Sequence, residues 1–393
     1  MNKRLIIMGS APCAFEDLER IPAFDRYDFM AIGLDVAAET CALPLKYVAT
    51  NHPEDITEIR RRRAFGSGNL DYALISYKPG PGVDIVQLLG PVSGSSAILG
   101  ALAAIALGYE KIILCGCPLT GNAPEGNPYE AFRPGWETAA DQVKGRVFSM
   151  SGWTREFLGS PAEITVGACW DGRDYYPPEY VNRLYNSVLR NTTIPFEFVL
   201  YTGPEAEKPG RTDAIDKAVR IVPTGLPYWW SGLSWWRKDL PGVTTDSVFY
   251  LDLDQVIVGS LDELMLFPSD QAYMKGYPSD GCPKGHEMEA CVSTSLLRRG
   301  AGVKVWEEYI AAGMPQWDPL KPPPNAPLRL ACQTIINDPK FGMAYDLYPE
   351  NWIVSYRLWA KRKGIKDDVR IVAFHGRPKM HECSEEWIQE HWR

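Results

Sequence analysis

The chain has 393 residues, 45% of them hydrophobic and 23% charged, which is long enough for two globular domains. Its formal net charge is −8 and neither half is basic, which argues against binding nucleic acid through bulk charge. No charge-free apolar stretch is long enough to cross a membrane, and the apolar run near Met1 is too short for a signal peptide, so we expect a cytoplasmic protein.

The first half alternates short apolar runs with helical patterns. We predict strands at Leu5–Met8, Phe29–Ile32, Lys46–Thr50, Asp71–Ser76 and Lys111–Cys115, and helices at Ala14–Arg20, Ala97–Leu107 and Met150–Leu158. Residues 119–147 are polar and rich in Gly, Pro and Asn, which predicts a long loop or lid. Strand, Gly/Ser turn, helix and strand in succession indicate an open parallel α/β sheet.

A domain boundary is expected at residues 159–161, Gly-Ser-Pro, which gives domains 1–160 and 161–393. The second half repeats the α/β pattern. We predict strands at 163–170, 196–201 and 219–222, then a strand at 248–258 that carries two carboxylates, a helix at 178–190, and an ordered proline-rich loop at 315–327. The fold class is therefore α/β, with two Rossmann-like domains.

The run from Val248 to Val258 is apolar, β-branched and aromatic, except for Asp252 and Asp254. Two buried carboxylates are costly unless they are paired. In an extended chain, residues i and i+2 point to the same face, so both can converge on one cation. Oxygen ligands of this kind suit Mg²⁺ or Mn²⁺. The run therefore predicts a metal site, with a turn cap as the alternative.

A second motif lies near the C-terminus, where residues 374–379 read Phe-His-Gly-Arg-Pro-Lys. Together with the Leu-Asp-Leu-Asp sequence at 251–254, it resembles the D-x-D and H-x-x-G-x-x-K-P motifs of GT-A-fold glycosyltransferases related to the glycogenin-like family 8. The spacing of the second motif is compressed. The resemblance covers residues 163–393 and implies a GT-A fold with a mixed, mainly parallel sheet.

The resemblance also implies roles for individual residues. It suggests Mn²⁺ (or Mg²⁺) held by two aspartates and a histidine, a UDP-sugar donor, and a catalytic face that includes Asp254. The implied metal ligands are Asp252, Asp254 and His375; the implied donor contacts are Trp170, Tyr175, Gly376 and Lys379; and the implied catalytic residues are Gln333 and Asp254.

Two departures from the family pattern concern the reacting centre. The family often has a lysine in a W-S-K-type motif, where this chain has Gly232, and an aspartate before the late glutamine, where this chain has Cys332. The tryptophans around Gly232, at positions 229, 230, 235 and 236, either stack on a sugar or base or form hydrophobic core.

The first half carries a different resemblance. The turn after residues 6–8 and the Ser-Gly-Ser-Ser sequence at 93–96 resemble the nucleotide-side blocks of family 42 sialyltransferases and related MptE/DUF115-type domains, over about residues 1–158. This implies nucleotide contacts from Gly9, Ser10, Gly94 and Ser95, where backbone would approach a phosphate. Those sialyltransferases use a histidine after the second block, and this chain has none between His52 and His286.

The sequence thus predicts an enzyme, a metal-dependent hexosyltransferase that moves a sugar from a nucleotide-sugar, with retention of configuration, to an acceptor hydroxyl. The acceptor is a glycan, a lipid-linked sugar, a protein or a modified nucleobase, and a homo-oligomer stays open. Two alternatives remain. Either the first domain is the active CMP-sugar or pyrophosphoryl transferase, or the second is a degenerate sugar-nucleotide-binding module. The cluster Arg60–Arg63 is interpreted as a solvated helix face, with a phosphate-binding patch as the alternative.

Overall fold

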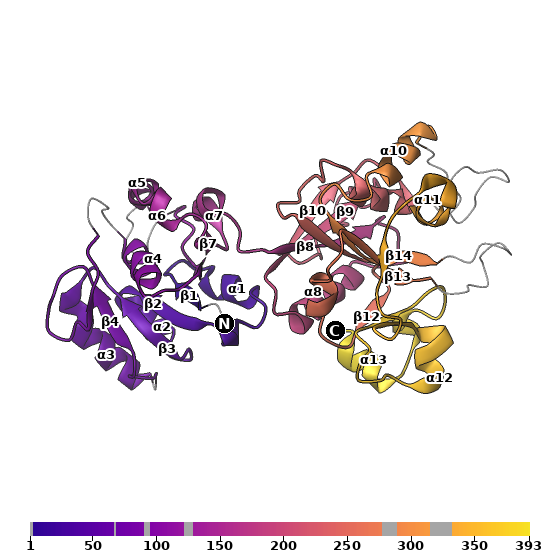
Figure 1. Cartoon of the computed structure of the whole chain (residues 1–393). Helices are drawn as coiled ribbons and strands as arrows, with labels where there is room; N and C mark the ends of the chain where they lie inside the picture. The colour runs from indigo at the N-terminus through magenta and orange to yellow at the C-terminus, as the bar shows by residue number, and fades with distance from the viewer. Residues whose placement is uncertain (1–2, 67, 90–94, 122–128, 277–288, 315–331) are drawn as a thin grey trace. The chain divides into compact units, whose positions relative to one another are not determined.

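The computed structural model of the chain describes residues 3–66, 68–89, 95–121, 129–276, 289–314 and 332–393. The chain divides into two compact units, Met1–Pro161 and Ala162–Arg393, each with its own large sheet (Figure 1). The division falls one residue beyond the expected boundary. The predicted loop at 315–327 lies outside the described residues. Within the described ranges, the protein contains no helix with both the length and the apolar character needed to cross a membrane.

The first unit is built on a seven-stranded sheet in the order β5-β4-β3-β2-β1-β6-β7, with parallel neighbours throughout. Its strands are β1 (Arg4–Met8), β2 (Asp28–Ile32), β3 (Leu45–Ala49), β4 (Ala73–Ser76), β5 (Ile85–Val86), β6 (Lys111–Cys115) and β7 (Val147–Ser149). Its helices are α1 (Ala14–Glu19), α2 (Gly33–Glu39), α3 (Ile56–Phe65), α4 (Ser96–Ala106), α5 (Arg133–Thr138), α6 (Ala140–Val143) and α7 (Gly152–Leu158).

Helices cover both faces of this sheet. Leu5 and Ile7 of β1 belong to the cluster that contains α4, whereas Ile6 and Met8 belong to the cluster that contains Leu18 of α1. This alternation follows from the two-residue period of a strand, and a strand buried on both faces is apolar at every position. The α/β class expected from the sequence is confirmed for this unit.

The prediction of a long loop at residues 119–147 is wrong. The described part of this segment contains α5 and α6 and runs into β7, which adds an edge strand to the sheet. Trp136, Ala139 and Val143 lie three and four residues apart and are fully buried in the α4 cluster. Helical spacing of this kind marks a buried face, but the surrounding Gly, Pro and Asn residues obscured it.

Helix α3 corrects part of the prediction for the arginine cluster. Arg61 and Arg62 pair with Glu58 on the solvated face, as expected. Arg63 is instead fully buried and donates to the carbonyl oxygens of Ala37 (2.8 Å) and Thr40 (3.3 Å) at the end of α2. This arginine satisfies helix-end carbonyls that would otherwise be buried without a donor.

The second unit contains a seven-stranded sheet in the order β10-β9-β8-β11-β14-β13-β15 and a three-stranded sheet in the order β12-β17-β16. The strands of the large sheet are β8 (Ile164–Trp170), β9 (Phe196–Thr202), β10 (Val219–Pro223), β11 (Ser247–Leu251), β13 (Gln271–Lys275), β14 (Ala290–Arg298) and β15 (Asp346–Leu347). Those of the small sheet are β12 (Gln255–Ile257), β16 (Ile353–Ser355) and β17 (Ile371–Ala373). The α-helices of this unit are α8 (Glu179–Asn191), α9 (Asp262–Met265), α10 (Lys304–Ala311), α11 (Cys332–Asn337), α12 (Lys361–Lys363) and α13 (Glu386–His391).

In the large sheet, β14 is antiparallel to both β11 and β13, and the remaining neighbours are parallel. The predicted mixed, mainly parallel sheet is therefore confirmed. The chain leaves β11 and enters the small sheet through β12, which pairs antiparallel with β17. This crossing links the middle of the chain to its C-terminal segment.

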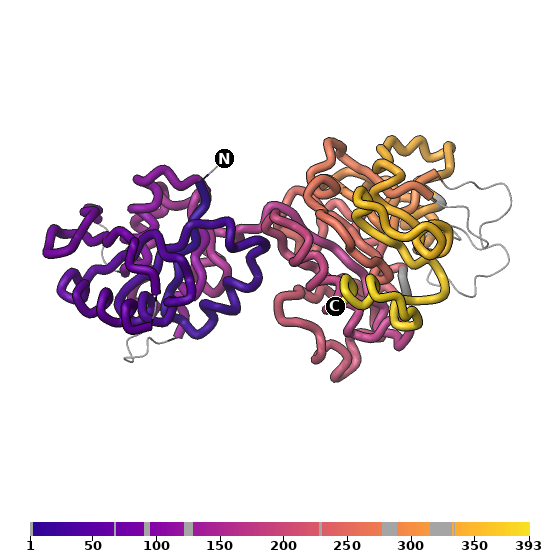
Figure 2. Tube along the Cα trace, turned by 90° about the horizontal axis from the view of Figure 1, so that it is seen from below, coloured from indigo at the N-terminus to yellow at the C-terminus, as the bar shows by residue number. Residues whose placement is uncertain are grey.

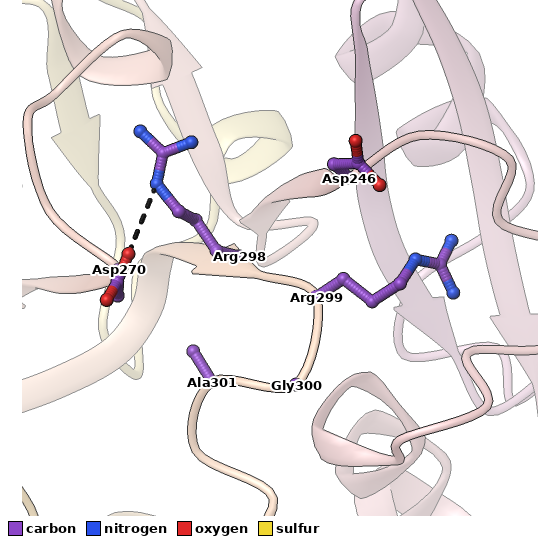
Figure 3. Close-up of a pocket in the computed structure, with 6 residues that line it drawn as sticks. All are labelled: Asp246, Asp270, Arg298, Arg299, Gly300 and Ala301. Atoms are coloured by element: carbon purple, nitrogen blue, oxygen red, sulfur yellow. Dashed lines mark ion pairs between the residues drawn. The ribbon is translucent and has the colours of Figure 1, made fainter.

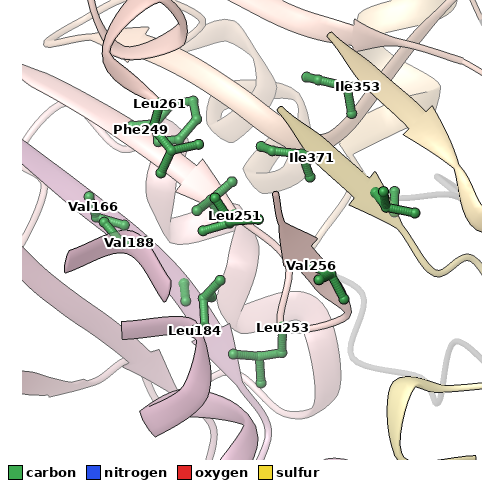
Figure 4. Close-up of a cluster of buried hydrophobic side chains, with 14 of the residues drawn as sticks. Val166, Leu184, Val188, Phe249, Leu251, Leu253, Val256, Leu261, Ile353 and Ile371 are labelled. Carbon is green, nitrogen blue, oxygen red and sulfur yellow. The ribbon is translucent and has the colours of Figure 1, made fainter. Parts of the chain in front are cut away.

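One apolar core joins the two sheets of the second unit. Figure 4 shows Leu251 of β11, Val256 of β12 and Ile371 of β17 in this core, and all three are fully buried. Helix α8 contributes its apolar face, and its polar residues hold the C-terminal segment: Arg183 and Ser187 donate to the carbonyl oxygens of Trp392 and His391, both at 3.1 Å. The Cα trace in Figure 2 shows this C-terminal segment in yellow within the second unit.

The tryptophan-rich 3-10 segment Tyr228–Trp236 belongs to a second core of this unit. Trp230, Trp235 and Trp236 are at most 1% exposed, so for them the hydrophobic-core interpretation is correct. Trp235 stacks on Tyr201 with ring centroids 3.9 Å apart. The side chain of Trp229 lies outside the described residues.

Candidate functional site

The two aspartates follow strand β11 directly. The strand ends at Leu251, so Asp252 and Asp254 lie in the short connection to β12 rather than within a strand. The backbone amide of Asp252 donates to the carbonyl oxygen of Ser293 in the neighbouring β14 (2.9 Å). This bond extends the β11–β14 ladder by one residue and fixes the backbone position of Asp252.

Asp252 is held in a buried, polar environment. Its Oδ1 accepts a hydrogen bond from the hydroxyl of Tyr250 (2.6 Å), which lies two residues earlier on the same side of the chain. Burial and the charge of Asp254 raise the pKa of Asp252 to about 6, in spite of hydrogen bonds that stabilise its charged form. A neighbouring carboxylate that raises the pKa of Asp252 in this way lies close to it, and two such carboxylates favour a cation between them.

Asp254 meets the C-terminal motif through the small sheet. The amide of Phe374 donates to the carbonyl oxygen of Asp254 (2.9 Å), which places the loop after β17 beside the aspartates. The ammonium of Lys379 lies 2.5 Å from Oδ2 of Asp254 and also donates to the carbonyl oxygen of Phe374 (3.0 Å). The hydroxyl of Tyr176 donates to the same Oδ2 (3.0 Å).

His375 lies within this loop, next to Phe374. Burial lowers the pKa of its imidazole, and the charge of Asp254 opposes that effect only in part. The ring is therefore neutral at pH 7, which is the form that ligates a metal. Gly376 follows with φ of +70°, a conformation that favours glycine, and turns the chain from His375 towards Lys379.

The chemistry of these groups fits the metal expected from the sequence. Two buried carboxylates and a neutral imidazole are a suitable donor set for Mn²⁺. Among the residues that the structure describes, no three His, Cys, Asp or Glu side chains are arranged closely enough to hold a metal ion. The ammonium of Lys379 is instead the cation at Asp254. The role of Asp252, Asp254 and His375 as ligands stays a prediction.

The predicted donor contacts differ in their exposure. Tyr175 is 47% exposed, and its ring centroid lies 5.6 Å from the ammonium of Lys379, so it is accessible at the edge of the site. Trp170 is 1% exposed and lies in the core. Its indole Nε1 donates to the carbonyl oxygen of Tyr176 (2.7 Å). Trp170 therefore supports the loop that carries both tyrosines, and its predicted contact with a donor stays a prediction.

Gln333 reaches the same region from α11. Its amide lies 3.1 Å from Sγ of Cys291, and that sulfur lies 3.3 Å from Oγ of Ser293, the residue whose carbonyl binds the amide of Asp252. Gly232 is also close, because a Cβ at this position would lie 3.7 Å from the Tyr250 hydroxyl. The places of the two family departures thus lie near Asp252.

Tyr176 and Tyr250 are the site residues that sequence reasoning missed. Each donates to one of the two aspartates. For Tyr250 a signal was present, because it lies two residues before Asp252 on the same strand face. Tyr176 had no such signal, since its contact with Asp254 joins residues 78 positions apart.

In the first unit, Gly9 and Ser95 stabilise the fold, whereas Ser10 lies on the surface. Gly9 donates its amide to Cys115 (2.7 Å), and a Cβ at Gly9 would lie 2.3 Å from the carbonyl oxygen of Gly116. Ser10 is exposed, with Oγ 3.1 Å from the hydroxyl of Tyr129. Ser95 caps α4 by accepting from the amide of Ile98.

Gly94 lies outside the described residues. His52, the histidine of this unit, has an exposed side chain 3.2 Å from Glu54. The predicted nucleotide contacts of the first unit stay predictions.

A separate hollow of about 560 Å³ lies at the opposite end of the large sheet, where β11 and β13 begin and β14 ends. Figure 3 shows its lining, with Arg298 paired to Asp270 (3.4 Å) on one side and Asp246 and Arg299 on the other. These are exposed surface side chains, and none of the residues predicted from the sequence lies there. We therefore place the candidate site at the aspartates.

No protein-family model matches the chain, and no curated protein matches it. Similar solved structures include the galactosyltransferase LgtC in complex with donor and acceptor sugar analogues. Its sequence identity is 13% and its TM-score 0.36, and the match covers 55% of this chain and 88% of LgtC. An active-site mutant of LgtC has 12% identity and a TM-score of 0.38, over 58% of this chain and 93% of the mutant. The glycosyltransferase GlyE of Streptococcus pneumoniae has 15% identity and a TM-score of 0.39, over 59% of each chain. Because these TM-scores are all below 0.4, the function is inferred from the residues of the site.

Proposed function

We propose that the second unit is a metal-dependent glycosyltransferase that takes a hexose from a UDP-sugar and transfers it to an acceptor hydroxyl. The observation that supports this most strongly is the meeting of the D-x-D connection with the His-Gly-x-Pro-Lys loop. Phe374 binds the backbone of Asp254, and Lys379 binds its side chain. Two sequence motifs more than a hundred residues apart thus form one polar centre.

The residues of this centre have complementary roles in the proposal. Asp252, Asp254 and His375 would hold the divalent cation, which, when bound, offsets the negative charge that develops on the departing diphosphate. Lys379 supplies a compact positive charge for a phosphate oxygen. Tyr176 orients the carboxylate of Asp254 through its hydroxyl.

The donor and acceptor sides are assigned with different detail. The exposed ring of Tyr175 would cover the nucleoside of the donor. Gln333, next to Cys291 at the start of β14, would line the face where the sugar reacts. We infer retention of configuration from the family-8 resemblance. The acceptor is a glycan, a lipid-linked sugar, a protein or a modified nucleobase.

A thermal-shift screen with UDP-, CMP- and GDP-sugars, each with and without Mn²⁺, tests the proposal. A ligand that binds only the folded protein raises its melting temperature in proportion to the logarithm of ligand concentration over Kd. We expect UDP-glucose or another UDP-hexose to raise the melting temperature only when Mn²⁺ is present. A shift with CMP alone that does not depend on metal would move the active site to the first unit.

A further inference from the structure

Lys379 is the most enclosed cation of the candidate site. The residue is 3% exposed, and its ammonium is surrounded by Oδ2 of Asp254 at 2.5 Å, the carbonyl oxygen of Phe374 at 3.0 Å, and the rings of Tyr175 and Tyr176 at 5.6 and 5.2 Å. In this arrangement Lys379 neutralises a carboxylate that the proposed function assigns to a metal ion.

The ammonium of Lys379 and a divalent cation cannot both bind the carboxylate of Asp254 at the same time. Oδ2 of Asp254 already accepts from Lys379 and from the hydroxyl of Tyr176. A divalent cation on the carboxylate of Asp254 would stand within a few ångströms of the ammonium, in a buried site where like charges repel strongly. Metal binding therefore requires Lys379 to leave Asp254.

The lysine side chain can make this move. Its ammonium is a point charge on a flexible four-carbon stem, so it can swing without breaking a fixed geometry. The backbone of Lys379 is anchored separately, because its amide donates to Oε2 of Glu382 (2.7 Å). A diphosphate on the metal offers the displaced ammonium a new anionic partner.

We propose that Lys379 is an internal counter-ion that competes with the divalent cation for Asp254 and moves to the donor diphosphate when both ligands are present. The free protein then binds metal weakly, and UDP strengthens metal binding by giving Lys379 another partner. By linkage, metal strengthens UDP binding by the same factor. This inference rests on the proposed function, because it assumes the metal and diphosphate positions given there.

The test is a titration of the full-length protein with Mn²⁺, in which free Mn²⁺ is followed by electron paramagnetic resonance, without and with saturating UDP. The variants are Lys379→Gln, which removes the charge but keeps a donor for Asp254, and Lys379→Met, which removes both. Lys275→Met is the control, since this exposed lysine pairs with Glu350 in the same unit.

In the wild type we expect UDP to tighten Mn²⁺ binding by about tenfold or more, the usual size of such coupling. In Lys379→Gln and Lys379→Met, Mn²⁺ binds about tenfold more tightly than in the wild type without UDP. UDP tightens Mn²⁺ binding in these variants by a smaller factor than in the wild type, because only the direct contact between diphosphate and metal remains. Lys275→Met behaves as the wild type. Lys379→Gln keeps the test valid if Lys379→Met fails to fold.

Two results would overturn the inference in distinguishable ways. If the Lys379 variants bind Mn²⁺ as the wild type does, or more weakly, the competition is absent while the metal site stands. If neither the wild type nor the Lys379 variants bind Mn²⁺ with or without UDP, the metal assignment of the proposed function fails, and the competition fails with it.

Discussion

The pair formed by Lys379 and Asp254 allows a quantitative prediction about stability without any ligand. The two side chains are 4% and 15% exposed, so each is a largely buried charge that depends on the other. Removing one partner of a buried pair typically costs about 3–5 kcal/mol, because the remaining charge is left without compensation. We expect Lys379→Met and Asp254→Asn each to lower the unfolding free energy of the metal-free protein by about this amount.

The double variant distinguishes the pair from two independent effects. With both charges removed, neither is left unpaired, so the double variant should lose less than the sum of the single variants, by about 1–3 kcal/mol. The assay is urea unfolding in EDTA, followed by tryptophan fluorescence. The exposed pair of Lys275 and Glu350 serves as a matched cycle, with an expected coupling below about 1 kcal/mol. Additive losses at Lys379 and Asp254 would refute the reasoning.

Three further predictions concern single positions. Gly167→Ala should lower the free energy of unfolding in urea by about 1–3 kcal/mol, because the new Cβ would lie 2.8 Å from the ring of Trp235. Gly232→Ala is the control and should not destabilise the protein, because its new Cβ would have no neighbour within 3.4 Å. Equal losses in the two variants would contradict this prediction. Burial raises the pKa of Asp17 above 3.8. The wild type should therefore lose stability relative to Asp17→Asn as pH rises through the pKa of Asp17 in the folded protein. A difference in unfolding free energy that does not change with pH would disprove this prediction. Tyr175→Ala should weaken UDP binding, measured by calorimetry, by ~1 kcal/mol. The melting temperature of the free protein should not change, because the residue is 47% exposed. An unchanged affinity for UDP would remove Tyr175 from the donor site.

The regular parts of the fold could be predicted from the sequence because strands and helices leave local patterns. The apolar runs at β1, β6 and β8 and the helix α4 all appear where expected. The segment from α5 to β7 could not be recognised, since Gly and Pro residues interrupt its pattern and its apolar residues become meaningful only when packed under α4. The buried position of Arg63 depends in the same way on where α2 ends.

For the candidate site, residue types could be predicted but not partners. The positions of Asp254 and Lys379 were identified from motifs, and their proximity follows from the pairing of β12 with β17. Their direct contact joins residues 125 positions apart, which no local pattern encodes. Trp170 shows the opposite limit: an aromatic residue at a strand end can support a loop from the core as well as face a ligand.

The most direct test of a metal-dependent glycosyltransferase uses Asp252→Asn. Asparagine keeps an oxygen for the hydroxyl of Tyr250 and resembles the protonated form that burial already favours, so this variant should fold as the wild type does. The control is Asp270→Asn at the opposite end of the large sheet.

The measurement is the release of UDP from UDP-hexoses by the full-length protein with Mn²⁺. We predict slow release by the wild type and by Asp270→Asn, abolished by EDTA, and a loss of about 100-fold or more in Asp252→Asn, on the scale of removing a group that stabilises charge in the transition state. Release by Asp252→Asn at the wild-type rate, or release that EDTA does not affect, would contradict the proposed function.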